Sequence, residues 1–293
     1  SRNKTLSCPL KADKYTFFKL EITELIDNKQ KPQLAELSID ASTELPYSDY
    51  TRTLDIDNAI HTVMYKENGI TFKREYFMSY PDNVMVMRLT SDSKKGKLSR
   101  IISLESLHTD KTITADSHTI TMTGYPTPVS GDKRVGDAWK NGLKYAQQLV
   151  VKNKGGKISV VDGTKLKVED ADEIIVLMSA ATNYVQCMDD SYNYFSQEDP
   201  LEKVQAMLHK VADKKYTALL ATHQKDYHSL YDRMRLNLGN LPEAPVAPTD
   251  SLLKGMDENT NSEQENQYLE MLYFQFGRYL LISSSREGSL PAN

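Results

Sequence analysis

The stretch that decides the fold is residues 61–77, HTVMYKENGITFKREYF, in which two runs rich in apolar residues flank Asn68-Gly69. Asn-Gly supplies the two positive φ angles of a type I′ turn, whose twist matches that of the flanking strands, so this stretch predicts a β-hairpin. Runs at 157–161 and 164–168 flank Asp162-Gly163 and predict a second hairpin for the same reason. The chain is therefore expected to contain antiparallel strands.

The same strand-like pattern extends from about Leu34 to Ala181, in short runs rich in Val, Ile, Thr, Tyr and Phe. The remaining runs lie at 37–40, 84–90, 99–105, 111–115, 119–123, 143–151 and 173–179. So many closely spaced strands without intervening helices favour an antiparallel β-sandwich over a fold of alternating strands and helices.

The periodicity changes at Asp199, where Asp199-Pro200-Leu201-Glu202 has the order of residues that begins a helix. Apolar residues then recur every three or four positions through 201–211 and again through 219–230, which predicts a second helix ending near Gly239. These two helices are expected to pack on the sandwich.

A connector with Pro242, Pro245 and Pro248 precedes a third predicted helix, Glu263 to Ser283. One sandwich face would hardly cover the apolar stripe of this helix, which consists of Tyr268, Leu269, Leu272, Tyr273, Phe276, Tyr279 and Leu280. We therefore expect self-association through Tyr273, Phe276 and Leu280. The expected domains are a sandwich (1–195), a helical linker with the proline-rich connector (196–249) and the start of a further domain (250–293).

Composition excludes several classes of partner. The 293 residues include 36 Lys and Arg against 40 Asp and Glu, so no strong positive field is available to hold nucleic acid. The longest apolar stretch, 174–181, is far too short to span a bilayer. Cys8 and Cys187 could form at most one disulfide and belong to no metal-binding motif.

Motifs for phosphate binding, dinucleotide binding, serine-elbow hydrolysis and zinc-protease chemistry are absent from the sequence. His223 and His228, five positions apart, are expected to diverge around a helix and to serve in packing or at the surface rather than to share a metal. We predict no metal site and no cofactor.

Paired carboxylates can catalyse glycoside hydrolysis, one as the acid and the other as the base or nucleophile. The local acidic clusters are Asp55-Ile56-Asp57 and Asp170-Ala171-Asp172-Glu173, both at expected strand ends or turns. Asp often bonds its own backbone there, so the structural interpretation is favoured over a catalytic one, and a calcium-binding turn is the minor alternative. For Arg74-Glu75, a cross-strand ion pair is as good an interpretation as a catalytic role.

Aromatic side chains offer a second route to carbohydrate binding, since a flat ring matches the C–H face of a sugar. Trp139, the sole tryptophan, lies in a glycine-bracketed segment, 136–142, and is a candidate ligand platform. A core-capping role for it is the commoner outcome. The cluster Tyr192-Asn-Tyr-Phe195 has the same two interpretations.

Several stretches together resemble glycoside hydrolase family 95, largely α-L-fucosidases with some α-galactosidases. They are 50–59 (YTRTLDIDNA), 72–82 (FKREYFMSYPD), 84–89 (VMVMRL), 143–151 (LKYAQQLVV) with Gly155-Gly156, 223–233 (HQKDYHSLYDR), and 273–286 (YFQFGRYLLISSSR) through 290–293 (LPAN). The resemblance begins at about Leu34, and residues 1–32 do not follow the family pattern.

This resemblance implies a large β-sandwich (a supersandwich), linker helices and then an (α/α)6 barrel, of which the chain would contain the first helix. It also implies inverting hydrolysis without a metal or cofactor, by an acid and a base in later barrel segments. We therefore expect an N-terminal fragment of a glycosidase, with no catalytic residue of its own. Arg286 and Asn293 are the candidates for substrate contact at the pocket rim, although Arg286 is more simply interpreted as a cap on helix carbonyls.

Two rival interpretations stay open, a free-standing carbohydrate-binding sandwich and a purely structural or interaction module. For the first of these, Trp139 and the tyrosines would form the contact surface. From the family alone, we expect the parent protein to break down bacterial polysaccharide or host glycans outside the cytoplasm, secreted or in the periplasm. The expected substrate partner is a carbohydrate.

Overall fold

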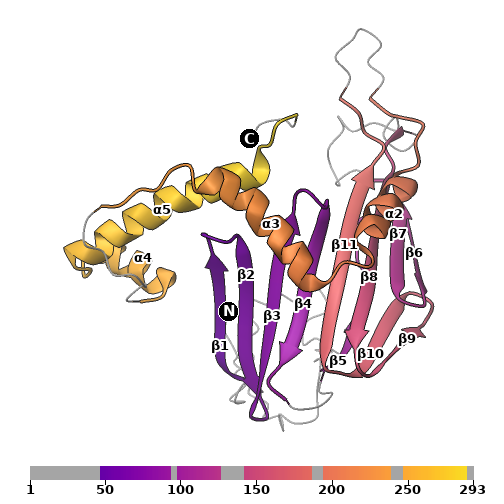
Figure 1. Cartoon of the computed structure of the whole chain (residues 1–293), viewed down its shortest axis with the longest axis horizontal. Coiled ribbons are helices and arrows are strands. Elements are labelled where there is room, and N and C mark those ends of the chain that lie inside the picture. Colours follow the sequence, from indigo (N-terminus) through magenta and orange to yellow (C-terminus); the bar gives the residue numbers. More distant parts are fainter. Residues whose placement is uncertain (1–46, 94–97, 127–141, 187–193, 239–246, 289–293) are drawn as a thin grey trace, which may run out of the picture.

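The computed structural model describes residues 47–93, 98–126, 142–186, 194–238 and 247–288, in which all the paired strands are antiparallel (Figure 1). One sheet has eight strands in the order β1-β2-β3-β4-β11-β8-β7-β6, and the other has three in the order β5-β10-β9. Their bounds are β1 Ser48–Asp55, β2 Ile60–Glu67, β3 Ile70–Ser79, β4 Val84–Ser91, β5 Leu98–Ile102, β6 Lys111–Asp116, β7 Thr119–Gly124, β8 Tyr145–Lys154, β9 Lys157–Val161, β10 Lys165–Ala171 and β11 Glu173–Thr182.

Both predicted hairpins are confirmed. Asn68 and Gly69 have φ values of 51° and 76°, and Glu67 pairs with Ile70 across the turn. Asp162 and Gly163 likewise have φ values of 53° and 64° between β9 and β10. Positive φ at both central residues is the backbone geometry that Asn-Gly and Asp-Gly were expected to supply.

Three details of the strand prediction change. Strand β1 was not predicted, because its sequence SDYTRTLD has little apolar character and all but one of its residues are exposed. Strand β5 ends at Ile102, earlier than the expected Glu105. The strand expected at 37–40 lies outside the described residues.

The larger sheet has a hydrophobic core on each of its faces. On one face, side chains such as Phe72, Ile120 and Ile174 pack against Leu166 and Val168 of the smaller sheet. On the other face, Phe77, Val86 and Leu177 pack against helices α2 (Pro200–Val211) and α3 (Tyr216–Tyr231). The alternation of side chains along each strand places neighbours such as Val176 and Leu177 in different cores. The structure is the predicted β-sandwich followed by helices.

The start of α2 is as predicted, because Asp199 Oδ1 accepts a hydrogen bond from the backbone N–H of Leu201 at 2.9 Å. Helix α3 ends at Tyr231, well before the expected Gly239, which lies outside the described residues. The expected total of three helices is also wrong, because a fourth, α4 (Thr249–Asp257), directly follows Pro248. The three prolines predict one extended connector, but proline at a helix start costs no hydrogen bond.

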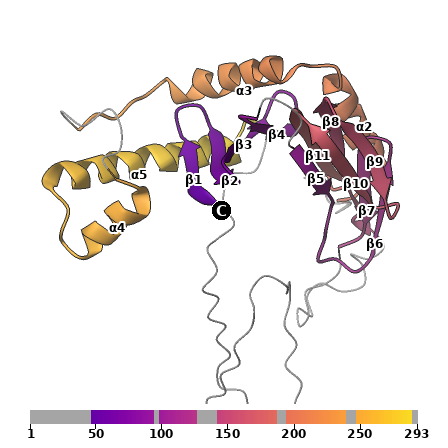
Figure 2. The same cartoon turned by 90° about the horizontal axis from the view of Figure 1, so that it is seen from below.

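Helix α5 (Glu263–Ser284) matches the prediction to within one residue. Its N-terminus carries a capping box, in which Ser262 and Glu265 satisfy each other's backbone N–H groups. Helices α4 and α5 extend beyond β1, the edge strand of the larger sheet (Figure 1, Figure 2). Leu269 is the sole buried residue of α5, whereas Tyr273 is 81% exposed and Leu281 is 61% exposed.

Gly156, in the turn between β8 and β9, allows a test of the fold. It has a φ of +66°, and an added Cβ would collide with the backbone carbonyl oxygen of Glu169 in β10. We predict that Gly156→Ala destabilises the protein by more than the ~1–2 kcal/mol that positive φ alone costs an L-residue. Gly69→Ala is the matched control, because its φ is +76° and no atom would meet its Cβ within 4 Å. Equal losses of unfolding free energy in urea for the two variants would contradict the predicted close approach.

Candidate functional site at the junction of sandwich and helices

The turn between β1 and β2, residues 56–59, joins the sandwich to the helices. Asp55 fixes this turn, since its carboxylate accepts hydrogen bonds from the backbone N–H and the side-chain amide of Asn58, at 3.1 and 2.8 Å. Ala59 completes the turn with a φ of 51°. The structural interpretation of Asp55-Ile56-Asp57 is therefore confirmed for Asp55, whose carboxylate binds its own turn.

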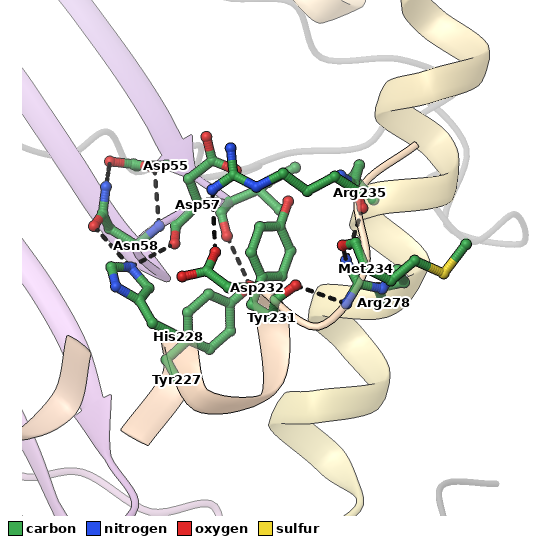
Figure 3. Close-up of polar contacts among 12 residues, drawn as sticks. Asp55, Asp57, Asn58, Tyr227, His228, Tyr231, Asp232, Met234, Arg235 and Arg278 are labelled. Carbon is green, nitrogen blue, oxygen red and sulfur yellow. Dashed lines mark hydrogen bonds and ion pairs between the residues drawn. The ribbon is translucent and has the colours of Figure 1, made fainter. Parts of the chain in front are cut away.

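Three consecutive carbonyls of this turn bind three side chains of α3. The Tyr227 hydroxyl donates to the Ile56 carbonyl at 2.7 Å. His228 Nε2 lies 3.0 Å from the Asp57 carbonyl oxygen (Figure 3). His223 Nε2 lies 3.0 Å from the carbonyl oxygen of Asn58. A carbonyl oxygen can only accept, so each imidazole must carry its proton on Nε2. The turn and the helix are thus joined by directional bonds.

His223 and His228 make contacts within the protein, in agreement with the packing interpretation of these residues. Each imidazole reaches a different carbonyl of the same turn, which the sequence did not predict. The amide of Gln224 adds a bond to Asn58 Oδ1 at 3.0 Å. Among the described residues, no group of three or more His, Cys, Asp and Glu side chains could hold a metal ion.

Burial sets the electrostatics of the junction. His223 is 5% exposed and its ring stacks on Phe77 at a centroid distance of 4.8 Å. Burial lowers the pKa of His223 below its ordinary value of 6.5, because a charged imidazole would lose its hydration there. Burial raises the pKa of Tyr231 to about 12, and the neighbouring Asp57 carboxylate adds to the shift. Both side chains are therefore neutral at neutral pH.

Two arginines attach α5 to this junction. Arg278 donates to the backbone carbonyls of Tyr231 and Met234 at 2.8 and 2.6 Å, and its guanidinium carbon lies 4.9 Å from the centre of the Tyr231 ring (Figure 3). Arg286, a predicted substrate contact, forms an ion pair with Asp226 of α3 at 2.7 Å. Its Nε also donates to the Ile282 carbonyl at 2.8 Å, which is the carbonyl-capping role that we favoured for it.

Another polar cluster lies on the sheet face beneath α3. Arg88 of β4 donates to Glu173 of β11 at 2.7 Å and forms an ion pair with Glu75 of β3 at 3.4 Å. The cross-strand partner of Glu75 is thus Arg88, not Arg74, which instead donates to the Tyr65 hydroxyl at 3.1 Å. Each of these carboxylates is paired with a cationic side chain. They therefore do not form the separate acid and base, on opposite sides of a cavity, that glycoside hydrolysis requires.

A polar hollow of about 160 Å³ lies at the far end of the sandwich, where α2 begins. Asp110, Tyr125, Lys144, Tyr145 and Asp199 are among its lining residues. The buried hydroxyl of Tyr145 has no hydrogen-bond partner among the described residues. The hollow is small, and its lining offers neutral, positively charged and negatively charged groups to a ligand.

The other predicted contact residues are placed as follows. Trp139 and Asn293 lie outside the described residues, so their sugar-binding roles stay predictions. Of the aromatic cluster at 192–195, the described Tyr194 stacks on Tyr184 with ring centroids 6.0 Å apart. Phe195 packs so closely on Gly142 that any added Cβ would collide with its ring. No helix in the described part of the chain is long and apolar enough to cross a membrane.

The burial of His223 makes stability depend on pH. Unfolded His223 titrates near its ordinary pKa and the folded residue titrates lower, so the unfolded state binds more protons as the pH falls below about 6.5. We predict that His223→Gln, which keeps a donor for the Asn58 carbonyl, loses less unfolding free energy than the wild type between pH 7 and 5. The difference should be at most about 1.4 kcal/mol per pH unit, the limit for one titrating group.

The exposed His209 of α2 supplies the control variant, His209→Gln. Denaturant unfolding at several pH values should give this variant the same pH dependence of unfolding free energy as the wild type. The same pH dependence in His223→Gln would show that His223 is not the buried titrating group.

Comparison with known proteins agrees with this architecture. Residues 13–187 match the family model for the glycosyl hydrolase family 65 N-terminal domain, and residues 215–293 match that for the glycosyl hydrolase family 95 catalytic domain. The first match covers the described sandwich strands, and the second begins one residue before α3.

Curated relatives carry fucosidase names. The Aspergillus niger protein named "Probable alpha-fucosidase A" is 31% identical over 266 residues, 89% of this chain and 31% of that protein. "Alpha-L-fucosidase 2" of Arabidopsis thaliana is 33% identical over 261 residues, 84% of this chain and 30% of that protein. An Aspergillus oryzae protein, also named "Probable alpha-fucosidase A", is 28% identical over 280 residues, 89% of this chain and 35% of that protein. The chain spans about a third of the length of these relatives. The chain therefore belongs to the proteins with a glycosyl hydrolase family 65 N-terminal domain, and its residues 215–293 are similar to the catalytic domain of family 95.

Proposed function

We propose that this chain is the N-terminal portion of an inverting α-L-fucosidase and that it supports the catalytic domain without catalysing hydrolysis itself. The observation that carries the proposal is the match of residues 215–293, which contain α3, α4 and α5, to a glycosidase catalytic domain. The fucosidase names of the curated relatives supply the substrate class. α-Galactosides are the second substrate class to be tested.

The carboxylates of the junction support a structural role. Inverting hydrolysis needs a protonated acid and a separate base, about 6.5 to 9.5 Å apart across the scissile bond. Asp55 binds its own turn, Asp226 pairs with Arg286, and Glu75 and Glu173 share Arg88. These carboxylates are engaged in contacts within the fold and do not form a pair facing a bound sugar. We therefore assign the acid and the base to further segments of the catalytic domain.

The exposed face of α4 and α5 is where those segments would pack. Its large apolar side chains are Leu253, Met256, Tyr273, Phe274, Phe276, Leu280 and Leu281, each between 37% and 81% exposed. Several large exposed apolar side chains on two helices in contact are typical of an interface. In the fucosidase we infer that the rest of the catalytic domain covers it, whereas the 293-residue chain alone would associate through Tyr273, Phe276 and Leu280.

The test compares the 293-residue chain with a protein extended through the whole catalytic domain. We predict turnover of an aryl α-L-fucoside by the extended protein and no turnover above background by the 293-residue chain. Sedimentation should show concentration-dependent association of the shorter chain, reduced by Tyr273→Glu, which places a charge on the most exposed ring of the face. Ser229→Glu, at an exposed position on α3, is the matched control.

Comparable turnover by both proteins would contradict the proposal and place the chemistry in the sandwich or its helices. Saturable binding of fucose or galactose by the inactive 293-residue chain would instead favour the alternative of a carbohydrate-binding sandwich. The polar hollow beside Tyr145 is the observation that favours testing this alternative. Action outside the cytoplasm stays a prediction from the family resemblance.

A further inference from the structure

We propose that Arg286 is a positioning residue that locks the C-terminal end of α5 onto both α3 and the sandwich. In the fucosidase this lock would fix the geometry of the active site that α5 helps to build, a consequence that rests on the proposed function. Arg286 lies two residues after the end of α5, outside the helix itself.

The guanidinium of Arg286 contacts three separate parts of the fold. Its Nη2 and Nη1 lie 2.7 and 3.4 Å from the two carboxylate oxygens of Asp226 in α3. Its Nε donates to the Ile282 carbonyl in the last turn of α5. Its central carbon lies 4.4 Å from the centre of the Tyr80 ring, in the turn between β3 and β4 of the sandwich. One side chain therefore connects α5, α3 and the turn between β3 and β4.

The geometry requires arginine. Only a planar guanidinium can place two N–H groups on a carboxylate while a third bonds a carbonyl and the flat face rests on an aromatic ring. Lysine offers a point charge on a flexible stem and cannot make all of these contacts together.

Burial distinguishes this ion pair from the surface pairs of the chain. The side chains of Arg286 and Asp226 are 15% and 21% exposed, whereas those of Arg235 and Asp232 are 67% and 46% exposed. Exposed pairs contribute little to stability, while removing one partner of a mostly buried pair leaves a charge with neither water nor a counter-ion. Arg286 and Asp226 should therefore act as a unit.

This role differs from the candidate substrate contact, and it includes the carbonyl cap that the sequence favoured for Arg286. The contacts to Ile282 and Asp226 direct three of the five N–H groups of Arg286 at protein atoms. A sugar hydroxyl would have to displace Asp226 to use those donors. We infer that Arg286 acts on the substrate through the position of α5.

The first experiment measures unfolding of the 293-residue chain in urea. Arg286→Gln, Asp226→Asn and the double variant should each raise the unfolding equilibrium constant by about tenfold, with the double variant no worse than either single one. Arg235→Gln and Asp232→Asn form the control cycle, in which each change should be small. The proposal would be overturned if the losses of unfolding free energy caused by Arg286→Gln and Asp226→Asn added up in the double variant. If Arg286→Gln does not fold, Arg286→Lys replaces it. The proposal then requires that Asp226→Asn lower the free energy of unfolding much less in the Arg286→Lys variant than in the wild type.

The second experiment measures kinetics of the extended protein on an aryl α-L-fucoside. A positioning role predicts that Arg286→Gln and Asp226→Asn lower kcat by the same factor, that the double variant lowers it no further, and that KM changes little. A direct sugar contact would instead raise KM in Arg286→Gln and leave it unchanged in Asp226→Asn, which would overturn the proposal. No hydrolysis by the extended wild-type protein would overturn the proposed function, and the unfolding experiment would still decide the role of Arg286.

Discussion

Three carbonyl groups in a single turn determine how the helices sit on the sandwich. The carbonyls of Ile56, Asp57 and Asn58 accept hydrogen bonds from Tyr227, His228 and His223, which occupy less than two turns of α3. The bonds to Ile56 and Asn58 are part-buried, where a carbonyl without a donor would cost free energy, so these two bonds penalise any other placement of the helix. The bond from His228 to Asp57 is exposed and adds direction. The direction of α3 across the sheet is fixed in this way, and α5 follows because Arg278 and Arg286 bind it to α3.

Apolar packing and hydrogen bonds have different roles at this junction. Fully burying a side chain such as Leu208 or Leu219 contributes about 1.5–3 kcal/mol, against about 0.5–1.5 kcal/mol for one hydrogen bond. The core beneath α2 and α3 therefore supplies most of the stability. Apolar contacts have little directional preference, however, and many helix orientations would bury similar areas. The hydrogen bonds to the β1–β2 turn select one of them. A structural role of this kind explains why polar residues occur on the buried side of α3.

The sequence was sufficient for elements with strong local signals. The Asn68-Gly69 turn, the Asp199 cap and the apolar period of α5 each depend on neighbouring residues, and all three were predicted correctly. Strand β1 was missed because edge pairing with β2, and not its own composition, makes it a strand. Helix α4 was missed because Pro248 looked like part of an extended connector.

The candidate site was harder to predict, because its contacts join residues far apart in the chain. Asn58 and His223 are separated by 165 positions, and no local pattern indicates that they meet. The pairing of Arg286 with Asp226, 60 positions away, likewise has no local signal, whereas the bond of Arg286 to Ile282 is the local capping contact that the sequence favoured. A signal was nevertheless present, since a helix with His223, Tyr227 and Tyr231 on the face that carries Leu219 must satisfy buried polar groups. That reasoning could have indicated a polar junction without identifying its partner.

The most direct test of this account measures the distance between the sandwich and α5. Spin labels at the exposed positions Lys165 in β10 and Glu270 in α5, with both cysteines changed to serine, report that distance by pulsed electron resonance. The account predicts one narrow distance distribution for the otherwise wild-type protein. It predicts a broad distribution after Tyr227→Phe combined with His228→Ala, which removes two of the three donors to the turn while keeping the ring of residue 227 in the core. A distribution that stays narrow and unshifted in the variant would contradict the claim that these hydrogen bonds orient the helices.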